Sequence, residues 1–558
     1  MRKENKTLFI GIAVAVVLIF CAAVISIVSS VFSGGDGKDE NGGYRSRFND
    51  QTLEQMLTKV TVSELPKSKG SVNLTTELYE ELPEIDKYPL AVQGDGDIDI
   101  EIFTSGEKAG KGNDSWLIDC AESFNRQRLT TAGGKRVSIS VRSVSSGLAA
   151  DYCISAKYLP DLYTPSNVLF GDYADAQGAV IELVQERLVG NTAGLLIKKG
   201  SSYTDTKAII DAVVNNEINI GYTNPQTSAT GLNLLIEILK TYGGIDNADA
   251  VSKFETFNNN IPFVAYTTQQ MRDSASGGSL DGMVTEYQAY INDNTLTSVY
   301  DFIPFGLRHD NPVYEVGTHT PEEKEAIGIV LDFLSNKDCQ KLASEKGFNA
   351  NDDYKGDYVS NGAEVTQALK VYKTSKDSGK SVVAVFVADC SGSMAGNAII
   401  ELQDSLSNGI NYINEGNYIG LVTYSTDVQI ALPIAQFDLN QKSYFQGAVD
   451  NMVANGNTST NEAILVAVDM IEKFLQTNPD AKPMIFVLSD GYANGYYEIE
   501  DIAHIVIESK IPIYTIGYTD DADKEKLAEL SGINEAATIS ADSDDVIYKI
   551  KSLFNSQL

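Results

Sequence analysis

Histidine and basic residues are scarce in this sequence. Its 558 residues contain three histidines, so acid–base or metal chemistry that depends on imidazole is poorly supplied. Lysine and arginine number 43 against 76 acidic residues, which gives a formal net charge of −33. So acidic a chain is repelled by nucleic acid and by anionic membrane surfaces, and nucleic-acid binding is excluded. The length suits two or three domains, and 43% hydrophobic residues suffice to fill their cores.

Cysteine is sparse as well. After the first 30 residues the chain contains four cysteines, at Cys120, Cys153, Cys339 and Cys390. They lie far apart and lack CxxC spacing, so they form neither a disulfide framework nor a zinc site. We expect buried free thiols, with a bridge between Cys120 and Cys153 as the alternative.

One long hydrophobic run is present, at residues 8–32, and it contains no charged residue. A helix of this length, at about 1.5 Å per residue, spans a bilayer. Basic residues precede the run, so the positive-inside rule places residues 1–7 in the cytoplasm and the rest of the chain outside. We expect a single-pass signal anchor in the cell membrane, followed by a stalk or linker at 33–94. A cleaved signal peptide is the alternative.

Residues 95–370 alternate between strand-like and helix-like segments. The runs "IDIEIF" and "RVSISVRSV" predict strands, and "SWLIDCAESFNRQ" and "GLNLLIEILKTYG" predict amphipathic helices. This alternation favours open α/β sheets with parallel strands, in which ligands bind at the carboxyl ends of the strands. The loops there are rich in hydroxyl groups and glycine, which suits an anion or a small polar solute. The same residues also favour helix N-caps and turns.

The runs "GDGDIDIEIFTSGEK", "SSGLAADY" and "GYTNPQTSATGLNLL" resemble bacterial extracellular solute-binding proteins of the type 2 periplasmic-binding class. The resemblance implies two α/β lobes joined by hinge strands, with a ligand cleft between them. On that cleft it places five residues: Ser105, Ser146, Thr164, Ser228 and Glu286. The carboxylate of Glu286 would favour a cation or a hydroxyl-bearing solute over an anion.

A second alternating series occupies residues 376–558. Asp389, Ser391 and Ser393 follow an apolar strand, Thr458 precedes a helix, and Asp490 ends the strand "MIFVLSD". The carboxyl ends of parallel strands lie along one edge of a sheet, so these five side chains can converge. Two carboxylates and three hydroxyls, without imidazole or thiolate, select Mg²⁺, or else Mn²⁺ or Ca²⁺.

Other chemistries fit this second series poorly. No histidine lies within 70 residues of Ser391, and the G-x-S-x-G elbow of a serine nucleophile is absent. The phosphate-binding motif G-x-x-x-x-G-K-[ST] is absent too. Capping of the next helix would explain Ser391 or Ser393 alone, but not Thr458 and Asp490.

The combination of D-x-S-x-S, "GNTST" and "LSDG" resembles the metal ion-dependent adhesion site of von Willebrand factor type A domains. The resemblance implies a Rossmann-like fold in which the two serines and Thr458 supply side-chain oxygens, with Thr460 as the alternate threonine. Asp389 and Asp490 would act directly or through water. An acidic residue of a partner protein would complete the metal's coordination.

We therefore expect an α/β protein with an N-terminal transmembrane helix, a solute-binding-like domain at 95–370 and a type A domain at 376–558. Its predicted function is binding rather than catalysis: a metal-dependent site engages an extracellular protein or surface ligand, beside a module for a small solute. The alternative is a transport or sensing component, in which the solute cleft is the main site and the type A domain docks a membrane partner.

Overall fold

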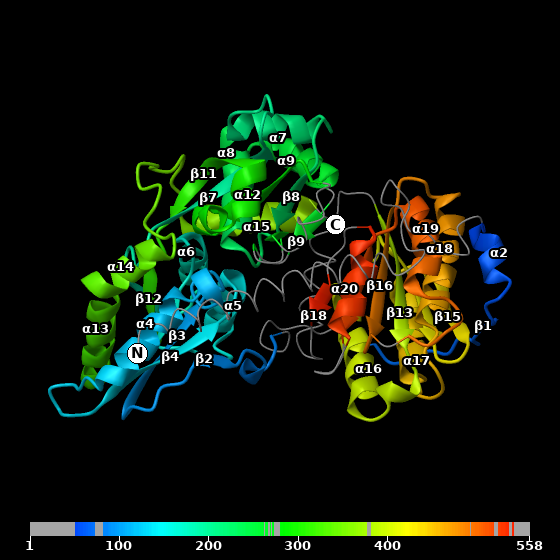
Figure 1. The fold of residues 1–558 in the computed structure, drawn as a ribbon, viewed down its shortest axis with the longest axis horizontal. Helices are drawn as coiled ribbons and strands as arrows, with labels where there is room; N and C mark the ends of the chain where they lie inside the picture. The colour runs from blue at the N-terminus through cyan, green and yellow to red at the C-terminus, as the bar shows by residue number, and fades with distance from the viewer. Residues whose placement is uncertain are drawn as a thin grey trace, which may run out of the picture.

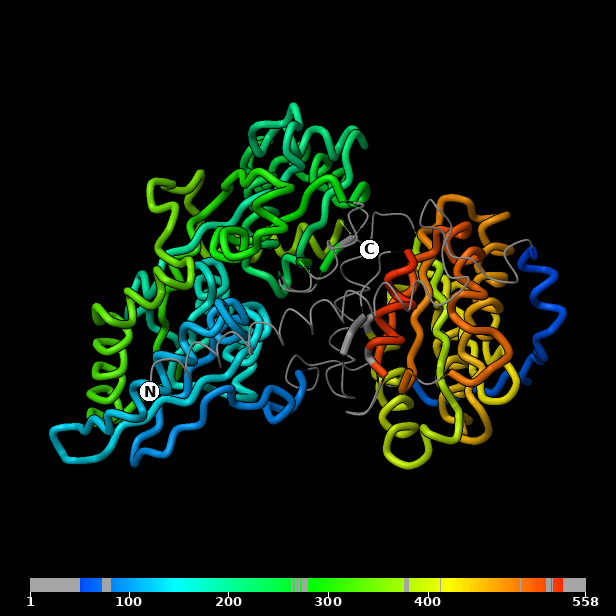
Figure 2. Tube along the Cα trace, viewed as in Figure 1, coloured from blue at the N-terminus to red at the C-terminus, as the bar shows by residue number. Residues whose placement is uncertain are grey.

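The computed structural model describes ten stretches of the chain: residues 51–72, 82–261, 263–265, 268, 271–272, 280–375, 381–491, 493–517, 523–534 and 538–540. They form two α/β bodies, which Figure 1 shows as ribbons and Figure 2 as a chain trace. The predicted anchor at 8–32 and the segments on either side of it, 1–7 and 33–50, lie outside the described residues. Within the stretches described, no helix is both long and apolar enough to cross a bilayer.

The first body contains two sheets. One has the strand order β2-β4-β3-β5-β12-β6 and the other β11-β7-β10-β8-β9. The strands of the first sheet are β2 (Leu90–Val92), β3 (Ile98–Thr104), β4 (Val137–Ser143), β5 (Leu162–Thr164), β6 (Ile181–Gln185) and β12 (Val313–Val316). Those of the second are β7 (Asn191–Lys198), β8 (Ile220–Thr223), β9 (Phe263–Ala265), β10 (Gly282–Glu286) and β11 (Tyr300–His309).

Each sheet is the centre of one lobe, and the chain crosses between the lobes after β6 and again after β11. The helices of the first lobe are α4 (Trp116–Gln127), α5 (Ser146–Ser155), α6 (Leu169–Ala176), α13 (Pro321–Leu334) and α14 (Lys337–Glu345). Those that follow or pack on the second sheet are α7 (Thr206–Val214), α8 (Ala229–Thr241), α9 (Ala248–Asn260), α11 (Tyr287–Asn292) and α12 (Asn294–Val299). Helix α15 (Gly362–Ser375) packs mainly against α6 of the first lobe and also against α8 and α9 of the second. The two lobes are those that the resemblance implies for 95–370. The expectation of parallel strands is wrong in part, because β10 and β11 pair antiparallel with β7, β12 pairs antiparallel with β5 and β6, and β2, from the predicted stalk or linker, pairs antiparallel with β4.

The second body is built on one sheet with the strand order β1-β15-β14-β13-β16-β17-β18. Its strands are β1 (Val62–Glu64), β13 (Val382–Asp389), β14 (Tyr418–Tyr424), β15 (Val428–Gln436), β16 (Lys482–Ser489), β17 (Ile513–Gly517) and β18 (Thr538–Ser540). Its helices are α2 (Leu53–Leu57), α16 (Asn397–Gly409), α17 (Leu439–Asp450), α18 (Thr460–Leu475), α19 (Ile499–Ser509) and α20 (Lys524–Gly532). All neighbouring strands are parallel except β14 and β15, which form an antiparallel pair.

The central strand β13 is buried along its whole length. Because successive side chains of a strand point to opposite faces, its residues divide between two cores. Phe386 lies in the core that includes residues of α16 and α17, and its neighbours Val385 and Val387 lie in the core that includes residues of α18 and α19. A strand buried on both faces is continuously apolar, which explains the run "VVAVFVA".

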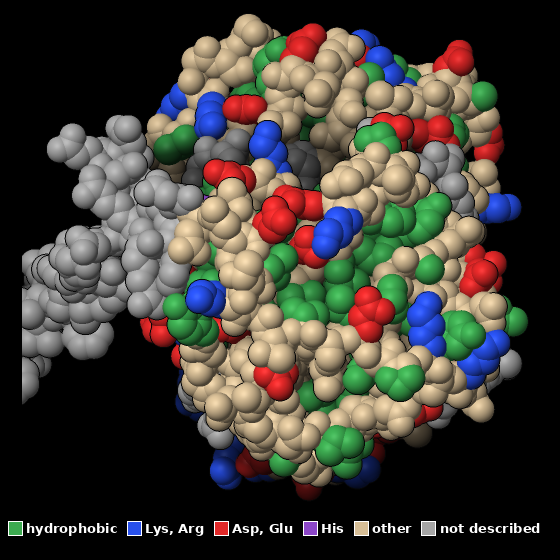
Figure 3. Space-filling view, turned by 90° about the vertical axis from the view of Figure 1, so that its right-hand side faces the viewer, with side chains coloured by type: hydrophobic (Ala, Val, Ile, Leu, Met, Phe, Trp, Pro, Cys, Tyr) green, Lys and Arg blue, Asp and Glu red, His purple; other side chains and the backbone are tan. Residues whose placement is uncertain are grey.

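Residues 51–72, within the predicted stalk or linker at 33–94, pack against the second body. Strand β1 pairs in parallel with β15 and forms one edge of the sheet, and Met56 of α2 is fully buried in the core beside α18. The hydroxyl of Tyr497 donates to the backbone oxygen of Met56 at 2.9 Å, and the Gly70 N–H donates to Ser443 O at 2.8 Å. This stretch therefore belongs structurally to the C-terminal domain, and we call it the N-terminal clasp. Figure 3 views the face on the side where α2 and β1 lie, with hydrophobic side chains gathered in a hollow near its middle.

We predict that Met56→Ala destabilises the C-terminal domain by about 2–5 kcal/mol, because it removes a fully buried side chain and leaves a cavity. Differential scanning calorimetry of the full chain would show one transition moving down while the other stays in place. Glu54→Ala, an exposed change in the same helix, is the control. An unchanged thermogram for Met56→Ala would show that the clasp adds nothing to the domain's stability.

Candidate functional site

The first candidate site lies at the carboxyl edge of the C-terminal sheet. Asp389 ends β13, Ser391 and Ser393 follow it, and Asp490 follows β16, the strand beside β13. The hydroxyls of Ser391 and Ser393 lie 3.0 Å apart, and the Ser391 N–H donates to Asp389 Oδ1 at 2.8 Å. Asp389, Ser391, Thr458 and Asp490 are all at most 5% exposed.

Backbone hydrogen bonds join the Thr458 loop to this group. The Gly392 N–H donates to Gly456 O at 3.1 Å, and the Asn455 N–H donates to Cys390 O at 2.8 Å. The structure therefore brings together the three polar segments that the sequence places on one sheet edge. The alternate threonine, Thr460, is engaged elsewhere: it is the first residue of α18, and its hydroxyl donates to Tyr424 Oη at 3.2 Å.

The electrostatics of this group favour a cation. Burial raises the pKa of Asp389, and the neighbouring charge of Asp490 adds to the rise, against hydrogen bonds from Ser391 and Ser489. Ser489 donates its hydroxyl to Asp389 Oδ2 at 2.7 Å. Two acidic side chains set into a buried sheet edge repel each other, and a divalent cation between them would relieve that repulsion. The remaining donors are hydroxyl oxygens, so the set fits a hard metal ion such as Mg²⁺.

No group of three or more His, Cys, Asp or Glu side chains in the described parts of the chain is arranged to hold a metal. The group at Asp389 does not meet that description because it has two carboxylates, with serine and threonine oxygens making up the rest. Such a group is found only when serine and threonine hydroxyl oxygens are counted as possible metal ligands.

The second candidate site lies between the two lobes of the first body. Lys108 is fully buried, and its ammonium donates to Ser105 Oγ at 2.9 Å and to Asn311 Oδ1 at 2.6 Å. The hydroxyls of Ser105 and Ser166 both donate to Glu107 Oε1, the first at 2.6 Å. Burial opposes ionisation of Glu107, but Lys108 and the two hydroxyls outweigh it and lower the pKa of that carboxyl.

Glu286 provides the second lobe's part of this site. Its Oε1 lies 2.9 Å from His309 Nδ1, and its Oε2 accepts a hydrogen bond from Asn191 Nδ2 at 2.5 Å. Burial and the charge of Glu107 raise the pKa of Glu286, against the opposing effect of His309 and Lys108. Burial also lowers the pKa of Lys108, which both carboxylates counteract. These charges thus interact with one another across the space between the lobes.

The lobes themselves approach closely. The Gly147 N–H at the start of α5 donates to Thr227 O at 3.0 Å, and a Cβ at Gly147 would lie 2.0 Å from Gln226 O. The guanidinium of Arg272 pairs with Asp114 at 3.0 Å from the opposite lobe. The lobes are therefore in contact around the charged cluster of Glu107, Lys108 and Glu286.

The five predicted cleft residues are all buried, but their surroundings differ. Ser105 and Glu286 belong to the charged cluster, and Ser146 accepts a 3.4 Å hydrogen bond from the Ser166 N–H. Thr164 ends β5, and its hydroxyl has no partner among the described residues. Ser228 caps α8 by accepting from the Gly231 N–H at 3.3 Å, which is the capping role that serine favours at such positions.

The sequence interpretation missed Glu107, Lys108 and His309. A signal for the first two was present, because "TSGEK" places a charged pair directly after a strand-end hydroxyl. His309 ends a long strand, and nothing in its local pattern marks it as the partner of Glu286.

All four cysteines of the two bodies are buried and free, as expected from their spacing. Burial raises the pKa of the Cys390 thiol, next to Asp389, to about 12. That thiol is therefore protonated at neutral pH and is a poor nucleophile.

Two family models match the chain. The von Willebrand factor type A domain matches residues 384–554, and the bacterial extracellular solute-binding protein matches residues 109–349. Both resemblances predicted from the sequence are confirmed. The chain combines a von Willebrand factor type A domain with a solute-binding-protein-like domain.

Curated relatives match the type A region. Inter-alpha-trypsin inhibitor heavy chain H3 is 30% identical over 173 residues in Mus musculus and 30% identical over 178 residues in Bos taurus. These alignments cover 29% and 30% of this chain and 19% of each relative. The chain thus spans about a fifth of the length of the relatives it matches.

Solved structures resemble each body at low overall scores. A von Willebrand factor type A protein from Catenulispora acidiphila aligns with 32% of this chain and 42% of its own, at 19% identity and a TM-score of 0.29. The sulfate-binding protein SubI from Mycobacterium tuberculosis H37Rv aligns with 46% of this chain and 88% of its own, at 16% identity and a TM-score of 0.34. A periplasmic thiamin binding protein aligns with 50% of this chain and 96% of its own, at 13% identity and a TM-score of 0.37.

We predict opposite effects of Asp389→Asn with and without Mg²⁺. Because burial raises the folded-state pKa of Asp389, the stability of the metal-free fold falls as the pH rises from the unfolded value, about 4, through the folded one. Asp389→Asn removes that loss, so at pH 7 it leaves the metal-free protein as stable as the wild type or more so. Mg²⁺ at 100 times its dissociation constant would stabilise the wild type by about 2.7 kcal/mol and the variant hardly at all.

Thermal unfolding with Mg²⁺ and with EDTA measures both effects. Asp469→Asn is the matched control, because it removes the same charge from the far part of α18, where Asp469 pairs with exposed Lys473. If Asp389→Asn kept the full Mg²⁺ shift, Asp389 would not hold the metal.

We predict that Glu286→Ala destabilises the solute-binding-like domain by about 2–5 kcal/mol, since it leaves the buried His309 ring and the buried Asn191 amide without the carboxylate that each contacts. Urea unfolding followed by the fluorescence of Trp116, the sole tryptophan, reports on this domain. Glu122→Ala breaks an exposed ion pair in α4 and is expected to change stability by less than about 0.5 kcal/mol. Equal effects of the two variants would mean that the Glu286 pair contributes nothing.

Proposed function

We propose that this protein is a membrane-anchored extracellular binding or adhesion protein without enzymatic activity. Its type A domain engages a protein or surface ligand through a divalent cation held by Asp389, Ser391, Ser393, Thr458 and Asp490. The observation that carries the proposal is the convergence of these oxygen donors from separate loops on one buried sheet edge.

Mg²⁺ is the proposed metal, with Mn²⁺ or Ca²⁺ as alternatives. Mg²⁺ binds oxygen ligands and usually retains some water. Ser391, Ser393 and Thr458 would offer neutral oxygens, and Asp389 and Asp490 would bind directly or through water. Because hydroxyls neutralise no charge, a carboxylate that binds only through water would leave part of the ion's positive charge uncompensated towards solvent. A carboxylate from a partner protein is the natural group to complete its coordination.

The solute-binding-like domain has a second role in this proposal. Where its two lobes meet, it buries carboxylates, an ammonium and hydroxyls, which are groups that suit a small polar solute. The cluster of Glu107, Lys108 and Glu286 is internally paired, which equally suits a scaffold whose lobes stay together. The alternative function remains a transport or sensing component in which this cleft is the main site and the type A domain docks a membrane partner.

The proposed topology retains the N-terminal anchor at 8–32, with the cytoplasmic end before it and both domains outside the cell. The clasp at 51–72 changes one aspect of that layout. Because it packs on the type A domain, the chain leaving the anchor first reaches the type A domain and only then enters the solute-binding-like domain.

We predict that the full-length protein captures its surface ligand at least about tenfold better in Mg²⁺ than in EDTA, because a carboxylate bound to the metal is worth more than 1.4 kcal/mol. The measurement is a pull-down of cell-surface proteins with wild type, Asp389→Asn and Asp469→Asn. A ligand that is lost with EDTA and with Asp389→Asn, but kept with Asp469→Asn, supports the proposal. Capture that is insensitive to EDTA and to Asp389→Asn would overturn it and favour the solute cleft as the main site.

A further inference from the structure

A pocket of about 220 Å³ lies beside the proposed metal site, between the N-terminal clasp and the type A domain. Asn457 and Ser459, which flank Thr458, line one wall, and Asn494 lines another. Asn494 Oδ1 accepts a hydrogen bond from the Thr458 N–H at 2.8 Å. The pocket is therefore built on the same loop that would hold the metal.

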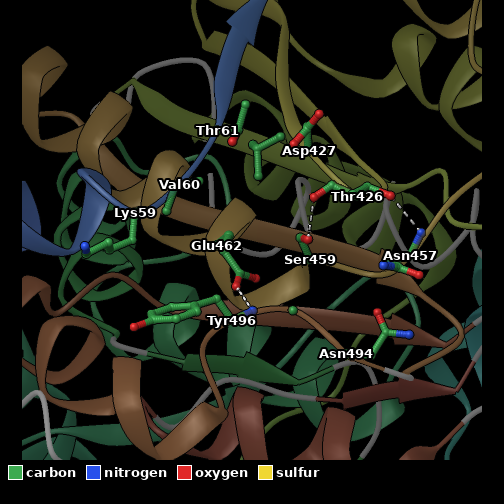
Figure 4. Close-up of a pocket in the computed structure, with 12 residues that line it drawn as sticks. Lys59, Val60, Thr61, Thr426, Asp427, Asn457, Ser459, Glu462, Asn494 and Tyr496 are labelled. Atoms are coloured by element: carbon green, nitrogen blue, oxygen red, sulfur yellow. Dashed lines mark hydrogen bonds between the residues drawn. The ribbon is translucent and has the colours of Figure 1, made fainter.

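The other walls come from the clasp and from the turn between β14 and β15. Thr61 O accepts from the Val428 N–H at 3.0 Å, which fixes the clasp against this turn. Thr426 Oγ1 accepts from the Asn457 N–H at 3.1 Å, and the Ser459 hydroxyl donates to Thr426 O at 2.9 Å. These bonds hold the pocket's walls together (Figure 4).

Glu462 gives the pocket its unusual chemistry. It is 4% exposed, and its Oε1 accepts from the backbone N–H groups of Tyr496 and Tyr497. Its Oε2 is buried and has no hydrogen-bond partner among the described residues. A buried carboxylate oxygen without a partner is costly, and an incoming donor would remove that cost. Figure 4 shows the Glu462 carboxylate among the lining residues, between Ser459 and Tyr496.

The surroundings of Glu462 favour a positively charged organic group. Asp427 adds a second, exposed carboxylate at the rim, and the side-chain amides of Asn457 and Asn494 add polar groups. Tyr496 is 53% exposed and offers a ring face suited to a cation. Lys59 also lines the pocket, but Figure 4 shows its ammonium directed away from the other lining residues.

A single metal ion fits this pocket less well. The volume far exceeds that of one ion. A lysine or arginine side chain can fill the space and satisfy several dispersed oxygens at once, and the fork of a guanidinium suits this best.

We propose that this pocket receives an arginine or lysine side chain of the protein partner. The partner would thus present two opposite charges: an acidic side chain to the metal and a basic one to Glu462 and Asp427. This inference rests on the proposed function for the partner's acidic side chain, but the pocket itself does not require the metal.

The test uses two small probes on the full-length chain in non-ionic detergent. N-acetyl-arginine N-methylamide carries the guanidinium, and N-acetyl-citrulline N-methylamide is its neutral isostere. Saturation-transfer NMR titrations would show wild type binding the arginine probe about tenfold more tightly than the citrulline probe, because the guanidinium makes charge-assisted hydrogen bonds that its neutral isostere lacks. The preference would persist in EDTA.

Three variants assign the effect. Glu462→Gln keeps the Oε1 acceptor but loses the charge, and it is expected to abolish the preference. Asp427→Asn, an exposed change that leaves the core untouched, is expected to reduce the preference about threefold, and Lys59→Gln to increase it. Equal binding of the two probes to wild type, or an unchanged preference in Glu462→Gln, would overturn the proposal.

The same variants separate this pocket from the metal site. Glu462→Gln is expected to leave the Mg²⁺-induced thermal shift intact, and Asp389→Asn to leave the arginine preference intact. A divalent cation that displaces the arginine probe from Asp389→Asn but not from Glu462→Gln would overturn the organic cation and make this pocket a second metal site. Loss of the Mg²⁺ shift alone would count against the metal site and not against the pocket.

Discussion

The burial of Asp389 next to Asp490 is the constraint on which the C-terminal domain's chemistry depends. Parallel strands end on one edge, so a sheet that buries β13 and β16 side by side also sets the residues that follow them close together. The fold therefore places two carboxylates that repel each other at a buried edge of the sheet, which is electrostatically unfavourable. Hydrogen bonds from Ser391 and Ser489 offset part of that cost, and the raised pKa of Asp389 shows that burial still prevails.

The solute-binding-like domain solves a similar problem in another way. It also buries charges where strands end, but it pairs Lys108 and His309 with Glu107 and Glu286 from its own chain. Its hydroxyls at Ser105 and Ser166 donate to an internal carboxylate. One domain therefore leaves two carboxylates close together, whose repulsion the proposed cation would relieve, while the other largely balances its charges within the fold.

The sequence predicts these two sites unequally, for physical reasons. The candidate metal site can be predicted from the sequence because Asp389, Ser391 and Ser393 are close in the chain and directly follow an apolar strand. The packing of the clasp on the type A domain cannot be predicted from the sequence, because the three residues of β1 are exposed and its partner strand lies more than 360 residues further along the chain. The Glu286–His309 pair is equally hidden, since periodicity reports which face is buried and not which buried polar groups meet.

The clasp also changes how the two domains can influence each other. The solute-binding-like domain is inserted between β1 and β13, so both of its ends lead to the same sheet of the type A domain. Residues 59–61 of the clasp line the pocket next to Thr458, and β1 is held at the sheet edge by β15. A displacement of β1 would therefore also displace one wall of that pocket. The solute-binding-like domain is thus tied at both of its ends to the sheet of the type A domain, a connection that two independent modules in series would not have.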